Sequence, residues 1–429
     1  MTKTVAVVTL GCKVNYTDSE SIADSLKASG YRVVQGHQRA TAAVVNTCTV
    51  TGKADYQSRQ AVRRMKREIG DGPVIVTGCS VVVYPDAIRG IGVESVAVHP
   101  DNRDSIPGRI RDLIGPPSDD PYNDISASGS SEDVCDGART RAFVKVQEGC
   151  NARCSYCVVP LARGEERSAP IEEVVGRISD LSRKGYREIV LTGIHLGRYV
   201  DSDDMSLLDL LRRLVKEKFP VRYRLSSLEP LEISDDLIRF MADTPEIAPH
   251  LHIPLQSGDD RILRDMRRPY RADQFAARVE KASMLLDSPG IGVDVMVGFP
   301  GEDDTAFHNT VSLIERLPVT YLHVFPFSPR PGTPAHRMRG QVPSKIKKDR
   351  ARIIREIGEE KSRIFRESRM GKTLEVLTER RDGAHLTGKS ENYLTVHMDD
   401  DSGEVNRIVP ITVVDLTEDG VYGKKAVRV

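Results

Sequence analysis

Short apolar runs alternate with amphipathic stretches in the first quarter of the chain. Runs at 5–10, 42–46 and 73–78 are rich in valine and have the length of buried strands. Between them, residues 17–30 and 54–70 have helical spacing, and each of these stretches ends in glycine. This alternation is typical of a parallel sheet with covering helices. We therefore expect an amino-terminal α/β domain over residues 1–115.

The next segment, 116–137, interrupts the pattern with proline, serine, glycine and acidic residues, which predicts a linker. Over residues 138–368 the strand-then-helix alternation returns six times. The six candidate strands are 142–147, 187–193, 221–227, 250–256, 291–298 and 320–327. Since eight such units close a full TIM barrel, six predict a partial βα barrel.

The end of the chain has a different pattern. A helical stretch runs from Pro343 to about Arg369, and short strand-like runs separated by turn residues follow it. These runs are 373–380, 393–398, 407–416 and 422–429. We expect a small antiparallel β-barrel over residues 369–429. The predicted fold class is therefore α/β, with a parallel-sheet domain, a partial six-unit βα barrel and a small terminal β-barrel.

Composition adds little to this picture, but the distribution of charge adds more. The chain is 39% hydrophobic and 29% charged, and no apolar stretch reaches the roughly 18 residues of a membrane span. The first apolar run is too short for a signal peptide, so we expect a cytoplasmic protein with no membrane partner. Net charge is zero, yet the segment from Arg337 to Lys372 carries 13 basic and 5 acidic residues. That segment is either a solvated helix face or a surface for a polyanion.

Three of the seven cysteines occupy equivalent positions. Cys12, Cys48 and Cys79 each follow an apolar strand, so in a parallel sheet they would converge on one edge. The alternative is three buried core cysteines, because cysteine is often fully buried. Clustered thiols in a chain without an export signal more often bind metal than form disulfides. Cys135, in the linker, has no assigned role.

Three more cysteines lie close together in the loop after the first barrel strand. Cys150, Cys154 and Cys157 have the spacing C-x3-C-x2-C, on the face where barrel enzymes keep their chemistry. A structural zinc site normally takes four protein ligands, and a ferredoxin run would add a fourth cysteine followed by proline. This loop has no fourth zinc ligand nearby and no further cysteine followed by proline. Thiolates also suit an iron–sulfur cluster. Three ligands leave one iron of a four-iron cluster open to a substrate or cofactor.

This spacing, with Tyr156 just before the third cysteine, resembles the signature of radical S-adenosylmethionine (SAM) enzymes. The resemblance implies a [4Fe–4S] cluster whose open iron is chelated by the amino and carboxylate groups of SAM. It also implies that an electron from the cluster cleaves the sulfur–C5′ bond and releases a 5′-deoxyadenosyl radical.

Motifs along almost the whole chain resemble the methylthiotransferase family within that superfamily. They are GCKVNYTDSE (11–20), NTCTVTGKAD (46–55), TGC (77–79), LTGIHLG (191–197), RLSSLEP (224–230), HLHIPLQSGDDRIL (250–263), VGFPGE (297–302) and FPFSPRPGTP (325–334). The resemblance implies a carboxyl-terminal TRAM domain that binds RNA. It also implies that Cys12, Cys48 and Cys79 hold a second [4Fe–4S] cluster, in a domain separate from the first.

The chemistry implied by this family replaces an unreactive C–H with C–S–CH3. The C2 hydrogen of adenine is neither acidic nor next to a leaving group, so a carbon radical is the plausible reagent and the cofactor carries the hard step. By resemblance, one SAM donates a methyl group to sulfur on the auxiliary cluster, and a second SAM supplies the radical. An external electron donor and a sulfur source are needed as well.

Residues that bind SAM are expected near the cysteine loop and at the ends of the barrel strands. The candidates are Tyr156, Thr192, Gly193, Ser227, Glu229 and Gln256. Glycine would let the backbone approach the cofactor, and Ser227 and Glu229 could bond ribose hydroxyls. Alternatively, Ser227 is a helix N-cap and Glu229 caps a turn. We expect His195 to be a loop histidine with an ordinary hydrogen bond; the alternative is a general base. No catalytic residue beyond the cluster ligands is assigned.

Three substrates are possible within the family. GCKVN, NTCTVTGKAD and GIHLG favour the type that modifies C2 of N6-threonylcarbamoyladenosine in tRNA, at adenosine 37 next to the anticodon. GCQMN or GCPKN would have indicated N6-isopentenyladenosine of tRNA or an aspartate of a ribosomal protein. The stretch SVVVYPDAI (80–88) departs from the alanine–glutamine expected after the third cysteine.

The basic segment followed by a small barrel suits tRNA as the partner, because RNA phosphates attract cations. The competing class is a non-enzymatic iron–sulfur protein for electron transfer or cluster delivery, and a zinc protein is a further alternative. Nothing in the sequence sets an oligomeric state.

Overall fold

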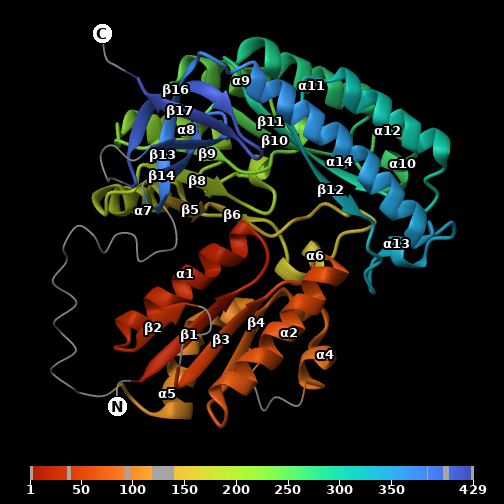
Figure 1. Ribbon diagram of the computed structural model, residues 1–429. Coiled ribbons are helices and arrows are strands. Elements are labelled where there is room, and N and C mark those ends of the chain that lie inside the picture. Colours follow the sequence, from red (N-terminus) through yellow and green to blue (C-terminus); the bar gives the residue numbers. More distant parts are fainter. Residues whose placement is uncertain are drawn as a thin grey trace. The chain divides into compact units, whose positions relative to one another are not determined.

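The computed structural model describes residues 3–35, 40–91, 97–117, 140–383, 385–399 and 405–426 (Figure 1). The chain divides into two compact units. The first comprises 1–131, 148–166 and 328–336, and the second comprises 132–147, 167–327 and 337–429. The loop with the second cysteine set thus belongs to the amino-terminal unit, which differs from the expected separation of the two sets. Most of the predicted linker, including Cys135, lies outside the described residues.

The first unit is built on a four-stranded parallel sheet in the order β2-β1-β3-β4. Its strands are β1 (Thr4–Thr9), β2 (Arg32–Gln35), β3 (Ala42–Thr47) and β4 (Val74–Gly78). Every position of β3 is buried, as expected for a central parallel strand. Three of these strands were predicted. The edge strand β2 was missed, because only two consecutive valines give it an apolar signal.

Helices cover both faces of this sheet. They are α1 (Lys13–Ala28), α2 (Gly52–Ile69), α3 (Cys79–Val83), α4 (Pro85–Arg89), the 3-10 helix η1 (Pro100–Ser105) and α5 (Ile106–Ile114). Successive strand residues point to opposite faces. Val44 therefore packs in the core that includes residues of α1 and α5, whereas Val45 packs in the core that includes residues of α2.

The second unit contains six parallel strands in chain order. They are β5 (Arg141–Lys145), β8 (Glu188–Thr192), β9 (Arg222–Leu225), β10 (His250–Gln256), β11 (Gly290–Val297) and β12 (Tyr321–Pro326). Ladders join β5-β8-β9 and β10-β11-β12, and the bridges Tyr223↔Ile247 and Ser227↔His252 connect the two groups. The expected partial six-unit barrel is confirmed.

Helices separate these strands. They are α7 (Ile171–Arg183), α8 (Leu207–Lys216), α9 (Asp235–Asp243), α10 (Asp260–Asp265), α11 (Ala272–Leu285) and α12 (Asp304–Arg316), with the long α14 (Ser344–Glu367) after β12 (Figure 1). Their apolar faces and the strands share one large core. No helix in the described part of the chain is long and apolar enough to cross a membrane.

The chain ends in a closed five-stranded barrel in the order β13-β14-β15-β17-β16. Its strands are β13 (Thr373–Asp382), β14 (His385–Ser390), β15 (Thr395–Asp399), β16 (Ile408–Leu416) and β17 (Val421–Lys425). All strand pairs are antiparallel except β15 with β17, which are parallel. The expectation of a wholly antiparallel barrel is therefore wrong for that one pair. Strand β14 was missed because its inward positions include Gly388 and Ser390, which carry no hydrophobic signal.

A buried ion network docks this terminal barrel onto the βα barrel within the second unit. Arg222 and Arg224 on β9 donate to Glu188 on β8, with Nε–Oε distances of 2.7 and 2.9 Å. Their remaining nitrogens donate to backbone carbonyls of the terminal barrel, for example Arg224 Nη1 to Glu391 O at 2.9 Å. A truncation that removes the chain from Met370 onward would therefore uncover these two buried arginines.

We predict that Glu188→Gln lowers the free energy of unfolding by about 3–5 kcal/mol, because it leaves both arginines buried without a counter-ion. Burial alone would raise the pKa of Glu188, but Arg224 and Arg222 outweigh it and lower this pKa to about 2. The carboxylate therefore stabilises the fold above the unfolded pKa near 4.5, and this stability is lost as the pH falls towards 2. Urea unfolding between pH 3 and 7 measures both effects.

The matched control is Glu172→Gln. Glu172 pairs with Arg213, but its side chain is 75% exposed, so its loss should cost less than about 1 kcal/mol. Equal stability losses in the two variants would contradict the assignment of the Glu188 network as the structural anchor.

Candidate metal centres and cofactor site

Three cysteines lie at the carboxyl ends of three neighbouring strands of the first unit. Cys12 is the N-cap of α1 after β1, Cys48 directly follows β3, and Cys79 is the first residue of α3 after β4. Since β1, β3 and β4 are adjacent and parallel, the three thiols share one edge of the sheet. This placement is the one expected from the sequence, and their role as ligands stays a prediction.

The environment of these thiols fits a thiolate-bound metal cluster. Burial, with a smaller contribution from the neighbouring Cys79 and Cys12, raises the pKa of Cys48 to about 12. Thiolates at such a site need a strongly cationic partner. Gly11 keeps the space beside them open, because a Cβ at its φ of 106° would lie 2.8 Å from Cys48 Sγ. The hydroxyl of Thr77, two residues before Cys79, is buried and has no hydrogen-bond partner among the described residues.

Arg163 connects the two cysteine segments of the first unit. It ends α6 (Val159–Arg163), which begins two residues after Cys157, and its side chain is buried. Its Nη1 lies 2.6 Å from Asp18 Oδ2 on α1 and 2.7 Å from Glu148 Oε1. Its Nη2 donates to Asn15, and its charge opposes the rise in the pKa of Cys79. The Arg163 Nε is buried with no partner in the described part of the chain, which suits an acceptor that the protein itself does not supply.

Backbone geometry shapes the loop with the second cysteine set. Gly149 has a φ of 75°, and a Cβ there would lie 1.8 Å from the carbonyl oxygen of Glu165. The amide of Cys150 donates to Gly164 O at 3.1 Å, which closes the base of the loop. The amide of Val159 donates to Cys157 Sγ at 3.4 Å, a contact that favours the thiolate form. All three cysteines are partly exposed, as a cluster open to a cofactor requires.

The candidate SAM-binding residues of the second unit lie at strand ends, as expected. Thr192 is the buried last residue of β8, and a Cβ on Gly193 would lie 3.0 Å from Gln147 Oε1. Ser227 is exposed after β9 and bridges to His252. Gln256, at the end of β10, has a left-handed φ of 63° next to a β-bulge. Such an outlier in a non-glycine residue is more frequent at functional sites. Tyr156 is half-buried in the cysteine loop of the first unit.

Two other candidates have protein partners of their own. Glu229 caps the turn η5 (Pro230–Glu232) and pairs with Arg268, so the capping alternative describes its local role. Burial raises the pKa of Glu229, whereas Arg268 opposes the rise. His195 Nε2 lies 2.6 Å from Glu232 Oε1, the kind of ordinary contact favoured from the sequence. A cofactor role for Glu229 stays a prediction.

Two polar features of the structure were not identified from the sequence. The first is Arg163, although the charged run RGEER after the cysteines could have indicated a charged residue with a structural role there. The other is a cluster of His252, Asp294 and His323 on β10, β11 and β12. The alternation in HLH (250–252) places two histidines on one face of a strand, and that pattern could have indicated this cluster.

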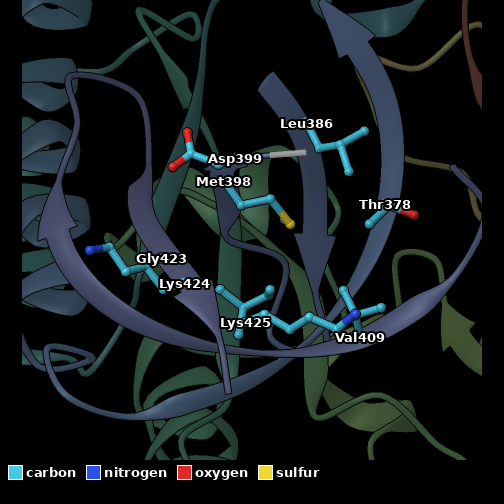
Figure 2. Close-up of a pocket in the computed structure, with 9 residues that line it drawn as sticks. Thr378, Leu386, Met398, Asp399, Val409, Gly423, Lys424 and Lys425 are labelled. Atoms are coloured by element: carbon cyan, nitrogen blue, oxygen red, sulfur yellow. The ribbon is translucent and has the colours of Figure 1, made fainter. Parts of the chain in front are cut away.

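The terminal barrel has a cavity of about 280 Å³ of its own (Figure 2). Leu386, Met398, Val409 and Ile411 give it apolar walls, and Asp399, Lys424 and Lys425 add charged groups. None of the candidate cluster ligands or SAM-binding residues lines it, so it is separate from the predicted site.

We predict that Arg163→Met destabilises the first unit by about 3–5 kcal/mol, since it leaves the carboxylates of Asp18 and Glu148 buried with less positive charge. Arg153→Met is the matched control, because Arg153 lies exposed in the same cysteine loop and its replacement should change stability by less than about 0.5 kcal/mol. Thermal unfolding followed by circular dichroism compares the two. Equal melting temperatures of Arg163→Met and wild type would contradict the network.

Two family models match the chain. The Uncharacterized protein family UPF0004 covers residues 4–98, and the Radical SAM superfamily covers residues 144–314. Among solved structures, the radical S-adenosylmethionine methyltransferase TsrM from Kitasatospora setae aligns with a TM-score of 0.57. That alignment has 15% identity and covers 78% of this chain and 74% of TsrM, so it shows a shared fold.

Curated relatives match over nearly the full length. The chain is 34% identical to the threonylcarbamoyladenosine tRNA methylthiotransferase MtaB of Thermotoga maritima, over 99% of this chain and 97% of that protein. It is 36% identical to MtaB of Bacillus subtilis, over 96% and 94%. It is 31% identical to the tRNA-2-methylthio-N(6)-dimethylallyladenosine synthase of Photobacterium profundum, over 99% and 92%. A radical SAM enzyme of this family holds a [4Fe–4S] cluster and binds SAM. The chain belongs to the methylthiotransferase family of radical SAM enzymes.

Proposed function

We propose that this protein is a tRNA methylthiotransferase that inserts a methylthio group at C2 of N6-threonylcarbamoyladenosine, at adenosine 37 beside the anticodon. The observation that carries the proposal is the 34–36% identity over nearly the whole chain to relatives named for that activity. A non-enzymatic iron–sulfur carrier is not supported, because the matched relatives are enzymes.

Two cysteine sets would hold the metal clusters. Cys150, Cys154 and Cys157 would hold the [4Fe–4S] cluster that binds SAM, and Cys12, Cys48 and Cys79 would hold a second, auxiliary [4Fe–4S] cluster. When bound, the clusters and SAM supply a carbon radical and a methylated sulfur, reagents suited to a C–H bond that acid–base groups cannot activate. An external electron donor and a sulfur source complete the reaction.

The protein's own residues position these parts. The Val159 amide and the Gly149 turn shape the loop with the second cysteine set. Arg163 follows that loop, and its charge acts on Cys79 at the strand edge. At the ends of the barrel strands, the residues that would contact SAM are Thr192, Gly193, Ser227, Glu229 and Gln256. Tyr156, in the cysteine loop of the first unit, is a further candidate for SAM binding.

Part of the basic segment is available for tRNA. Lys345 and Lys348 at the start of α14 are exposed, as are Arg337 and Arg339 before it. Several other cations of the segment are engaged within the protein. Arg350 is buried and donates to Glu302, and Lys347 donates to the carbonyl of Phe327. We assign the phosphate contacts to these four exposed cations at and just before the start of α14.

We predict that the reconstituted enzyme adds a methylthio group to an anticodon stem-loop carrying N6-threonylcarbamoyladenosine at position 37. Cys150→Ala should abolish 5′-deoxyadenosine formation, because no other residue replaces this ligand. Cys12→Ala should keep SAM cleavage but lose the methylthio product, and its iron content should fall by about half. Nucleoside mass spectrometry and a 5′-deoxyadenosine assay measure these outcomes.

Cys135→Ala is the control for general thiol loss and should match wild type. Methylthio product from Cys12→Ala would show that the auxiliary-cluster assignment is wrong. A wild-type enzyme that modifies a stem-loop with N6-isopentenyladenosine and leaves the threonylcarbamoyl stem-loop unchanged would overturn the proposed substrate.

We also predict that the double variant Lys345→Ala/Lys348→Ala weakens tRNA binding and flattens its salt dependence. Each lost phosphate contact should lower the slope of log affinity against log salt by about 0.7–0.9. The matched control is Lys361→Ala on the same helix, because the Lys361 ammonium donates to the carbonyl of Leu317 within the protein. Filter binding across a salt series decides it, and an unchanged slope in the double variant would place the RNA elsewhere.

A further inference from the structure

A polar cluster lies on the inner face of the β10–β12 sheet. His252 Nε2 is 2.9 Å from Asp294 Oδ1, and His323 Nδ1 is 3.4 Å from the same oxygen. Asp294 and His323 are register partners on β11 and β12. The flanking residues Leu322 and Val324 pack against the hydrophobic core. Because side chains alternate along a strand, His323 and Phe325 must face the opposite side, towards the inside of the barrel.

Aromatic residues close the barrel below this cluster, towards the amino ends of the strands. The hydroxyl of Tyr321 lies 2.8 Å from His250 Nε2 and 3.3 Å from His252 Nδ1. Tyr393, from the terminal barrel, brings its ring centroid to 4.6 Å from that of His250. We call Tyr321, His250 and Tyr393 the aromatic plug. Gly292 makes room for it, since a Cβ there would lie 2.0 Å from the Tyr321 ring.

His323 differs from its neighbours in its accessibility. Both ring nitrogens of His252 have protein partners, Asp294 and Tyr321, and the residue is buried. The side chain of His323, by contrast, is 53% exposed, although its Nδ1 faces Asp294. Phe325, two residues further along the same face, is 43% exposed. An oriented imidazole and an accessible aromatic ring therefore lie together between the plug and the strand ends.

We propose that His323, oriented by Asp294, hydrogen-bonds the polar N6 substituent of the substrate adenosine, with Phe325 against the apolar part of the substituent or base. The proposal rests on the proposed function and deepens it. A threonylcarbamoyl group carries N–H, carbonyl, hydroxyl and carboxylate groups, whereas a dimethylallyl group has no hydrogen-bonding atom. A histidine can serve such a substituent as donor or acceptor, and aromatic rings commonly contact flipped bases.

This arrangement explains discrimination between the two modified adenosines. A site that hydrogen-bonds its substrate rejects an analogue without the polar groups, because its own groups would then be left desolvated and unpaired. Asp294 strengthens this effect. Desolvation alone would raise the pKa of this partly buried carboxyl, but hydrogen bonds from His252 and His323 outweigh it and keep the pKa well below its usual range. Asp294 is thus a positioning residue, and His323 is the residue that determines specificity.

Two histidines and a carboxylate with ligand atoms within 4.8 Å also have the composition of a metal site. We argue the substrate interpretation because the exposed half of His323 adjoins the exposed ring of Phe325, which suits a nucleoside better than an ion. Metal binding at this cluster is an outcome of the test.

The test compares His323→Leu and His323→Gln with the control His308→Gln, a histidine exposed on α12. Fluorescence anisotropy measures binding of anticodon stem-loops that carry threonylcarbamoyladenosine, isopentenyladenosine or unmodified adenosine at position 37. His323→Leu should weaken binding of the threonylcarbamoyl stem-loop about 10- to 100-fold. It should leave binding of the unmodified stem-loop within about twofold and shift the kcat/KM ratio towards the isopentenyl substrate. His323→Gln should lose less, and the control should match wild type.

Three outcomes overturn the inference. If wild type modifies the threonylcarbamoyl stem-loop but His323→Leu keeps the wild-type preference, His323 does not read the substituent, and the proposed function stands. If wild type modifies only the isopentenyl stem-loop, the proposed function itself fails and the inference fails with it. If a variant lacking all six cluster cysteines binds one equivalent of metal that His323→Leu abolishes, the cluster is a metal site.

Discussion

A buried guanidinium must be neutralised, and in the first unit this requirement fixes the geometry of both cysteine sets. Arg163 contacts Asp18 and Glu148, and Arg103 pairs with the same two carboxylates. Two cations thus balance two anions in a largely buried network. Asp18 lies one to two turns into α1, the helix that Cys12 caps, while Glu148 and Arg163 flank the loop of Cys150–157. Any shift of either cysteine segment would separate these charges, at a cost of several kcal/mol.

The second unit uses the same constraint for a different purpose. Glu188 alone cannot satisfy the ten N–H groups of Arg222 and Arg224. Carbonyls of the terminal barrel accept four of the remaining hydrogen bonds, so the network is complete only when that barrel is docked. The same barrel supplies Tyr393 to the aromatic plug. A segment expected only to bind RNA therefore also closes the amino end of the βα barrel.

The sequence predicted what depends on local pattern and did not predict what depends on side-chain convergence. Valine-rich runs identified the central strands, and the position of each cysteine after such a run placed three thiols on one edge. Strands β2 and β14 were missed because their inward positions are few or polar. Arg163 and Asp18 are 145 residues apart, and His252 and His323 lie on different strands. Only the folded register brings such pairs together, since no local propensity records it.

Desolvation explains why so few of the barrel's inner polar groups are available for recognition. A buried imidazole or hydroxyl without a partner costs free energy, so the Tyr321 hydroxyl contacts both His250 Nε2 and His252 Nδ1. These atoms are engaged with one another within the lower part of the barrel. His323 avoids the cost by remaining half exposed, with Asp294 fixing its orientation through one nitrogen. The energetics of burial therefore leave this one position on the cluster able to exchange water for a substrate group, and its rigid support makes that exchange selective.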